Sequence, residues 1–205
     1  MSTRRMRGFS LIEMIIVVTV LLIACAVSFM TLQPALKQGH VTSAYNFTLG
    51  ALRKAREDAV GDRRVYMVTF TTSAVLNVPS TITITQSDTG LVTSSYTLPV
   101  DVKFQTQTGF PTSQTTAPTT PDGFGVGVNS IDFDQGVSGG VTSAIYFYPD
   151  GSAQDVNNNI NNGVIYMGRT GDLYSSRAIT VWGATGRLRG WRLLQNGASN
   201  YWRQM

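Results

Sequence analysis

An uncharged apolar run near the N-terminus constrains the fold of this chain more than any other feature. Residues 14–32 are nineteen consecutive positions without a charged side chain. A helix rises about 1.5 Å per residue, so the run spans about 30 Å, the thickness of a bilayer's hydrocarbon. In lipid the backbone must satisfy its own hydrogen bonds, which enforces a helix even where Val, Ile and Thr are frequent. The run therefore predicts a membrane-spanning helix.

Positive charge before the run sets the predicted orientation. Arg4, Arg5 and Arg7 carry three of the four net positive charges of the chain. Cytoplasmic flanks of membrane helices are enriched in Lys and Arg. We therefore expect residues 1–8 to lie in the cytoplasm and everything after Leu32 to lie outside it.

Glu13 is unexpected at the start of such a helix. An ionised carboxylate beside lipid costs a few kcal/mol and is usually retained for a partner. Cleavage between Gly8 and Phe9 would create an α-amino group at Phe9, about one helical turn from Glu13. That amine, in the same chain or in a neighbouring copy, would neutralise the carboxylate.

The stretch GFSLIE at residues 8–13, between a basic leader and the apolar run, resembles the signal of type IV prepilins and type II secretion pseudopilins. In that family a prepilin peptidase cuts after the glycine and methylates the new N-terminus, and the apolar helix becomes the core of a filament. The resemblance implies cleavage between Gly8 and Phe9, N-methylation of Phe9 and a role for Glu13 in assembly.

Two other processing signals overlap the run and remain alternatives. Residues 24–26, ACA, look like the small-residue site of a signal peptide, and LIAC at residues 22–25 resembles a lipoprotein box. Either cleavage would discard Glu13 and leave a secreted or lipid-anchored β-domain unrelated to filaments. Otherwise Cys25, the sole cysteine, is a small membrane-embedded hydrophobe and forms no intramolecular disulfide.

Beyond the membrane the periodicity predicts a second, amphipathic part of the helix. Pro34 is expected to loosen it, and Gly61 and Asp62 are expected to end it. One apolar stripe recurs at spacings of three and four residues: Val41, Ala44, Tyr45, Thr48, Leu52, Ala55 and Ala59. We therefore divide the N-terminal part into a cleaved leader (1–8), a transmembrane and filament-core helix (9–33) and an amphipathic helix that packs on a sheet (34–61). His40, the only histidine, is expected at the surface.

Residues 62–205 are predicted to form a β-rich domain. Segments that alternate with period two and are rich in Val, Ile, Thr and Tyr are expected as antiparallel strands. They cover residues 64–70, 81–86, 91–98, 102–105, 130–133, 144–148, 163–168, 178–182 and 190–194. The Thr- and Pro-rich stretch at about 106–122 is expected to be an exposed loop. The predicted fold class is α+β, a long helix packed on a mostly antiparallel sheet.

This order of elements is similar to the GspH/FimT-like branch of pseudopilins and minor pilins. The sequences AIYFYPDG at 144–151, ITVW at 179–182 and TGRLR at 185–189 carry the likeness. The resemblance implies a low-abundance structural subunit, at or near the tip of a filament.

Sequence signatures of enzymes are missing from the chain. It has no second histidine, no cysteine pair and no GxxxxGK. The stretch DVNNN at 155–159 faintly resembles a calcium loop but lacks the next Gly and the distal Glu. We expect no enzymatic activity, no cofactor and no metal.

The C-terminal region concentrates arginine, with six Arg against Asp172 in residues 169–205. In an extended strand Arg187 and Arg189 would project to one face, where guanidinium groups could pair with phosphates. The Gly-Arg-x-Arg sequence resembles the motif by which FimT-like minor pilins are held to bind DNA in natural transformation. The resemblance implies phosphate contacts by Arg187 and Arg189, with Arg192 and Arg203 as helpers by proximity. Arginines on the solvent face of a terminal hairpin are the plainer interpretation.

The expectation is therefore a single-pass inner-membrane prepilin with its C-terminal domain in the periplasm, which later joins a type IV pilus or a type II secretion pseudopilus. Its expected partners are the prepilin peptidase, other pilin or pseudopilin subunits and the inner membrane. A DNA-binding minor pilin for DNA uptake is the alternative function. Trp182, Trp191 and Trp202 are expected to pack against the sheet instead of stacking on bases.

Overall fold

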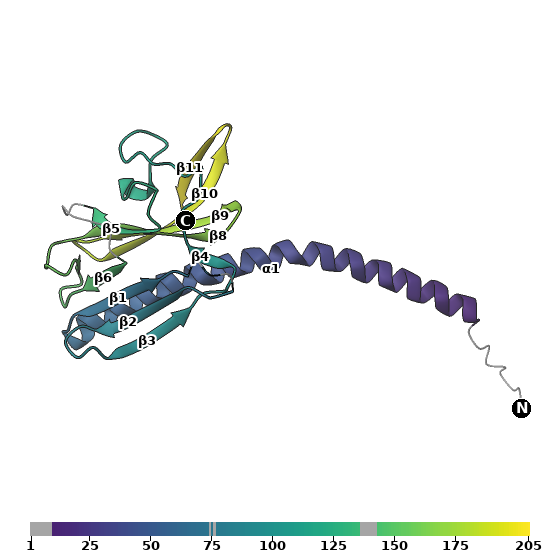
Figure 1. Cartoon of the computed structure of the whole chain (residues 1–205), viewed down its shortest axis with the longest axis horizontal. Coiled ribbons are helices and arrows are strands. Elements are labelled where there is room, and N and C mark those ends of the chain that lie inside the picture. The colour runs from purple at the N-terminus through teal and green to yellow at the C-terminus, as the bar shows by residue number, and fades with distance from the viewer. Residues whose placement is uncertain (1–9, 74, 76, 136–142) are drawn as a thin grey trace, which may run out of the picture. The chain divides into compact units, whose positions relative to one another are not determined.

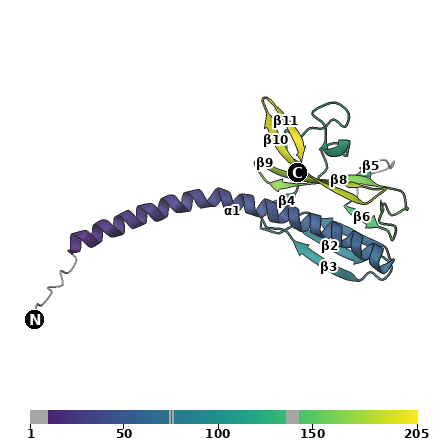
Figure 2. The same ribbon diagram turned by 180° about the vertical axis from the view of Figure 1, so that it is seen from behind.

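The computed structural model describes residues 10–73, 75, 77–135 and 143–205. The chain separates into two compact units, Met1–Gly39 and His40–Met205. Gly8 and Phe9 lie outside the described residues. Figures 1 and 2 show the elements from opposite sides.

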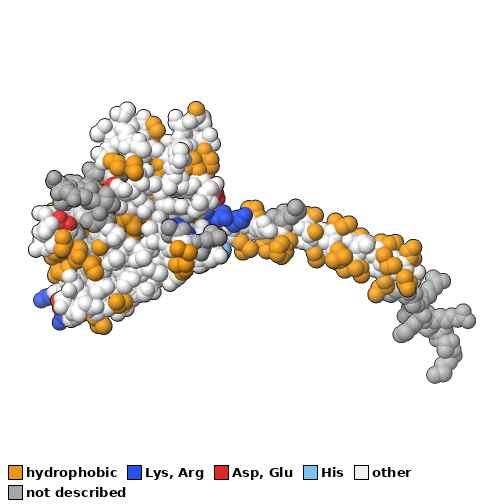
Figure 3. All heavy atoms as spheres, viewed as in Figure 1, with side chains coloured by type: hydrophobic (Ala, Val, Ile, Leu, Met, Phe, Trp, Pro, Cys, Tyr) orange, Lys and Arg blue, Asp and Glu red, His pale blue; other side chains and the backbone are white. Residues whose placement is uncertain are grey.

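The first unit consists of the N-terminal part of one long helix, α1 (Leu11–Asp62). The helix is continuous through Pro34, where the sequence suggested loosening. From residue 10 to residue 39 every described side chain is exposed, and Figure 3 shows apolar side chains along this part of the helix. No described residue of this unit covers them.

The second unit contains the rest of α1, which has a buried stripe. The side chains fully removed from solvent are Val41, Ala44, Thr48, Ala51, Leu52, Ala55 and Ala59. Their spacing confirms the predicted apolar stripe, apart from Tyr45, which is only half-buried. Four of the seven are alanines, whose small side chains let the helix backbone approach the sheets closely. Arg63 adopts a left-handed conformation (φ 55°) and ends the helix one residue later than expected.

One antiparallel sheet has the strand order β3-β2-β1-β6-β7. Its strands are β1 (Tyr66–Thr71), β2 (Thr81–Gln86), β3 (Val92–Thr97), β6 (Ala144–Phe147) and β7 (Ala153–Gln154). The pattern of β1 alternates buried and partly exposed residues, as the sequence predicted.

The other antiparallel sheet has the order β11-β10-β9-β8-β4, and β5 also pairs with β8. Its strands are β4 (Val102–Phe104), β5 (Ile131–Gln135), β8 (Asn162–Arg169), β9 (Asp172–Trp182), β10 (Arg187–Asn196) and β11 (Ser199–Gln204). Strand β11 was not predicted, and β9 begins six residues earlier than expected. The predicted α+β class with a long helix and antiparallel strands is confirmed, although the strands form two sheets.

Two clusters of buried apolar side chains hold the second unit together. The larger lies between α1 and both sheets and includes Leu52, Val68, Phe133, Ile165 and Ile179. The smaller covers the opposite face of the β8–β11 region and is centred on Tyr166 and Trp202. Both clusters draw only on residues 41–202. The unit from His40 onward therefore contains its entire described core and can fold without the first unit.

The expectation of an exposed loop at 106–122 is wrong in part. Phe110 is buried against Tyr166 and Trp202, with ring centroids 5.4 and 5.1 Å apart. Thr120 and Pro121 are buried too, and Pro121–Gly123 forms a short 3-10 helix, η1. The middle of the segment is mostly exposed. A few anchoring side chains therefore fold this polar segment over the smaller cluster.

Candidate functional site

The N-terminal candidate site is described only from Ser10 onward. The Met14 amide donates to the Ser10 carbonyl at 3.1 Å, and Glu13 lies in the first turn of α1. A carboxylate in the first turn is stabilised by the unpaired amides of the helix end. The predicted cleavage between Gly8 and Phe9, and the pairing of the Phe9 amine with Glu13, stay predictions because Gly8 and Phe9 are not described.

Helix α1 is also the membrane candidate. Among the described residues it is the one helix that is both long enough and apolar enough to cross a bilayer. None of its most apolar window is buried within the protein. Apolar side chains exposed over such a length need lipid or other protein around them.

The four C-terminal arginines singled out in the sequence are all on the β10–β11 hairpin. Arg187 and Arg189 lie on the face of β10 opposite to Leu188, which packs toward the larger core cluster. Arg192 lies on the same face of β10 as Leu188. Arg203 on β11 is the cross-strand partner of Arg192. The hairpin therefore presents Arg187 and Arg189 on one face and Arg192 and Arg203 on the other.

Arg189 is bound inside the protein. Its Nη1 donates to Asp122 Oδ1 at 2.6 Å, and its guanidinium lies 5.2 Å from the centre of the Trp182 ring. The other carboxylate oxygen of Asp122 accepts bonds from Thr180 Oγ1 at 2.5 Å and Trp182 Nε1 at 3.0 Å. The Asp122 side chain is 5% exposed. These bonds fix η1 to strands β9 and β10. They also engage the Arg189 guanidinium, which the sequence suggested as a phosphate ligand.

Asp122 was missed by the sequence analysis. Pro121, Asp122 and Gly123 have the composition of a turn, which explains the left-handed conformation of Asp122 (φ 53°). The only available signal was an acid in a segment with few charges. Its partner 67 residues away was not readable from local pattern.

A second group of arginines forms a row across three strands. Arg192 is the register partner of Arg177 on β9 and of Arg203 on β11. Arg177 is 4% exposed and donates from Nη1 to the carbonyls of Ser175 and Ser176, at 3.1 and 3.2 Å. Burial, and then the neighbouring charge of Arg192, lower the pKa of Arg177 to about 10. Arg192 and Arg203 are exposed and make no ion pair with any residue that the structure describes.

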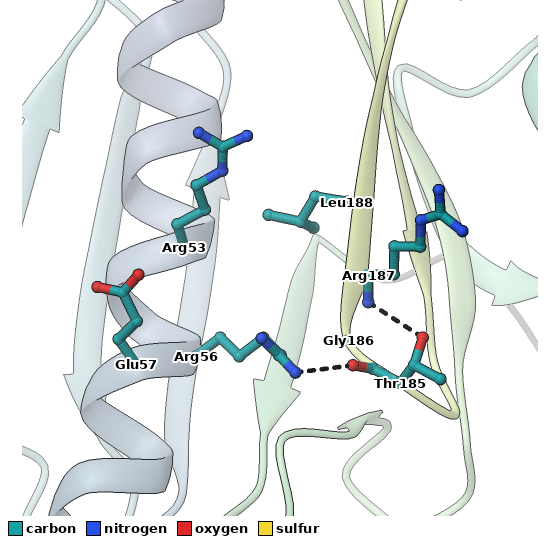
Figure 4. Close-up of a pocket in the computed structure, with 7 residues that line it drawn as sticks. All are labelled: Arg53, Arg56, Glu57, Thr185, Gly186, Arg187 and Leu188. Carbon is teal, nitrogen blue, oxygen red and sulfur yellow. Dashed lines mark hydrogen bonds between the residues drawn. The ribbon is translucent and has the colours of Figure 1, made fainter.

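A groove of about 450 Å³ lies between α1 and the β9–β10 turn (Figure 4). Arg56 donates from Nε to the Gly151 carbonyl and from Nη2 to the Thr185 carbonyl, each at 3.1 Å. Figure 4 shows Leu188 pointing toward the helix and Arg187 pointing away from it. Arg56 therefore ties the turn to the helix, while the guanidinium of Arg187 is free to face solvent.

The remaining sequence candidates have structural roles. His40 is exposed, as expected, but its Nδ1 lies 2.9 Å from Asp101 Oδ1, and Arg169 Nε donates to the other oxygen of Asp101 at 2.9 Å. Asp155 accepts bonds from the amides of Asn157 and Asn159, which closes a polar turn. Within the described ranges no group of three or more His, Cys, Asp and Glu is placed to hold a metal.

The three tryptophans pack as expected. Trp202 belongs to the smaller core cluster, and Trp182 and Trp191 pack against it. Trp191 Nε1 donates to Thr180 Oγ1 at 3.1 Å. Trp202 is buried, and Trp182 and Trp191 are partly buried against the same cluster, which is the packing role that the sequence predicted.

Comparison with known proteins identifies the N-terminal segment. Residues 3–29 match the family model described as the prokaryotic N-terminal methylation motif. No curated protein matches the chain. Among solved structures, the type IV minor pilin FimU of Pseudomonas aeruginosa aligns with a TM-score of 0.42 at 10% identity, over 82% of this chain and 94% of that one. The motif match covers the same residues as the predicted signal, so in its N-terminal segment the chain is type IV pilin-like.

Proposed function

We propose that this chain is a minor pilin or pseudopilin, a structural or initiating subunit of a type IV pilus or a type II secretion pseudopilus. In this proposal the prepilin peptidase cuts between Gly8 and Phe9 on the cytoplasmic side and methylates Phe9. The β-domain then lies in the periplasm while the helix anchors the protein in the inner membrane. Other pilin or pseudopilin subunits replace lipid around the helix when the filament forms.

The observation that carries the proposal is the methylation motif at residues 3–29, placed directly before and within an exposed apolar helix. Within its unit, every described side chain from residue 10 to residue 39 is exposed. Such a helix needs lipid before assembly and other helices after it. The second unit, by contrast, is a complete folded body that can contact partners outside the membrane.

Intact-mass measurement of the protein purified from its native membrane tests this proposal. The expected mature chain begins at Phe9 and carries one added methyl group. A mature chain that begins at Cys25 or Val27 would instead support the secreted or lipid-anchored alternative. A peptidase-deficient strain is the control, and there the mass should include residues 1–8.

DNA binding for uptake is the second candidate function. The exposed side chains of Arg187, Arg192 and Arg203 favour it, because each lacks an ion pair among the described residues. Two observations weaken the case for phosphate binding by the Gly-Arg-x-Arg motif. Arg189 is bound to Asp122, and the other three arginines are divided between the two faces of the hairpin.

Gel shifts of residues 37–205 with DNA, at stated salt, test this candidate. Changing Arg187 to Gln should weaken binding and flatten its salt dependence if the motif contacts phosphate. No retention of DNA at low salt by the unchanged domain would remove this function.

A further inference from the structure

The row of arginines on β9, β10 and β11 is unbalanced in charge. Arg192 and Arg203 lie directly opposite each other, and like charges in that arrangement destabilise a strand pair. On the neighbouring strand β9, Arg177 is buried beside Arg192. Among the described residues, no carboxylate lies within salt-bridge distance of Arg177. The three positive charges therefore form a site that an anion would stabilise.

The row ends at a free sheet edge. Strand β11 is the last in its sheet, and no described strand pairs with its outer side. Arg203 and Gln204 are exposed on this strand. A hollow of about 390 Å³ beside the row is lined by Arg192, Leu194, Arg203, Gln204 and Met205. Edge strands of this kind accept an extended segment through main-chain hydrogen bonds.

The hydrogen-bond pattern of the hairpin shows which residues of β11 could bond to an added strand. The Met205 amide donates to the Gly190 carbonyl at 2.9 Å, so that pair is hydrogen-bonded. Alternation along an antiparallel ladder then makes Arg203 and Arg192 hydrogen-bonded to each other, and it turns the backbone groups of Trp202 and Gln204 outward. A new antiparallel strand would bond to those two residues. Its residue opposite Arg203 would fall in the closer, non-hydrogen-bonded type of pair.

We propose that the outer edge of β11 binds an extended, acidic segment of another protein subunit, with one carboxylate opposite Arg203 and within reach of Arg192. The carboxylate would relieve the repulsion between the two guanidiniums and extend the charge row by one strand. This inference depends on the second unit alone and does not require the proposed filament role.

The surroundings favour a protein carboxylate over nucleic acid. Leu194 and Met205 line the same hollow, and Arg with Met and apolar side chains is typical of protein interfaces. The three tryptophans belong to or pack against the smaller cluster, on the face opposite to Arg192 and Arg203, so they cannot stack on bases at this row. Among the described residues of β10 and β11, the exposed cations on this face are Arg192 and Arg203, which are enough for a carboxylate.

Peptide titration of ¹⁵N-labelled residues 37–205, followed by NMR, tests the proposal. The probe is acetyl-Thr-Ser-Val-Glu-Val-Ser-Thr-amide, and its matched control has Gln in place of Glu. We expect the Glu peptide to shift the amides of Trp202 and Gln204 and to bind about tenfold more tightly than the Gln peptide. A third peptide with proline on both sides of Glu should not bind, because proline cannot complete the ladder.

Variants of the domain make the test specific. Arg192→Gln and Arg203→Gln should each reduce the affinity for the Glu peptide to that for the Gln peptide. Arg187→Gln is the matched control, because this exposed arginine lies on the opposite face and should leave binding unchanged. All three positions are exposed, so a well-dispersed spectrum is expected for every variant.

Three outcomes would overturn the proposal. The first is equal affinity for the Glu and Gln peptides, and the second is an absence of shifts at β11 at the highest soluble peptide concentration. The third is a single-stranded oligonucleotide that binds through Arg192 and Arg203 while the Glu peptide does not, which would assign the row to nucleic acid. If Phe9 is found not to be the mature N-terminus, only the filament role fails.

Discussion

Two stretches of the same helix, residues 11–29 and 41–59, differ in what surrounds them. In the first, the side chains are apolar on every side and exposed. In the second, a narrow stripe is buried and most of the other residues are polar or charged, with Phe47 as an exposed apolar exception. A helix that is apolar all round suits lipid or a helical bundle, while a one-sided stripe suits a sheet. One continuous helix can therefore be built for two environments, and the residue at which its apolar pattern narrows to one side shows where the environment changes.

The largest expected effect concerns the one charge at the start of the first stretch. Glu13→Ala should leave membrane insertion intact, yet reduce incorporation into filaments by at least about a hundredfold, because an amine left without its carboxylate in an apolar filament core would cost about 3–5 kcal/mol. Immunoblots of sheared filaments and of membranes measure the two quantities separately. Ser10→Ala is the control, and wild-type incorporation of Glu13→Ala would show that the carboxylate has no assembly role.

A matched pair of leucines tests the difference between the two stretches directly. Leu52→Ala should lower the free energy of unfolding of the second unit by about 2–5 kcal/mol, because it empties a fully buried site. Leu22→Ala removes the same atoms from an exposed site and should change it by less than about 0.5 kcal/mol. Urea denaturation of the full chain in detergent compares them. Equal effects would contradict the division of the helix.

The buried ion pair in the second unit gives the next effect. Asp122→Ala should cost about 3 kcal/mol of unfolding free energy, because Arg189 would remain three-quarters buried without its carboxylate. A double-mutant cycle with Arg189→Gln should show strong coupling, since the two groups share a hydrogen bond. Arg187→Gln should show no coupling energy with Asp122→Ala. A coupling energy as large as that of Arg189 would refute the assignment of Arg189 as the partner of Asp122.

The smallest effect depends on pH at the C-terminal end of the helix. Tyr66 Oη donates to Asp62 Oδ2 at 2.5 Å, and this bond raises the pKa of Tyr66 from 10.0 to about 12. A raised tyrosine pKa means that the stabilisation is complete below pH 10 and is lost as the pH rises toward 12. Urea titrations at several alkaline pH values should show a steeper loss for the wild type than for Tyr66→Phe. Parallel curves would exclude the linkage.

Local periodicity predicted much of the fold. The stripe on α1 and most strands followed from spacings of three, four and two residues, which the backbone geometry dictates. The unpredicted parts depend on distant partners. Strand β11 follows a tight turn at Gly197 and lacks a clear alternation, and its pairing with β10 gives it order. Whether the strands form one sheet or two is likewise a matter of long-range pairing.

The candidate site was predictable to different extents in its two parts. The N-terminal motif is contiguous, so the sequence alone indicated residues 8–13, and the family match covers the same residues. The hairpin arginines were found by composition, but their faces and partners were not. Alternation separates Arg187 from Arg192, and only the fold brings Asp122 to Arg189 and places Arg177 in the row.

The contact between Tyr45 and Gly190 has a mechanical consequence. Because Gly190 has no side chain, the Tyr45 side chain lies directly against the backbone of β10, and an added Cβ at this position would collide with the phenolic oxygen of Tyr45. With Arg56 held to the β9–β10 turn, the helix is attached to this strand region at two separate points. Tension applied at residue 40 would therefore pass into β10 and its turn through both points, so that neither contact alone would carry the load.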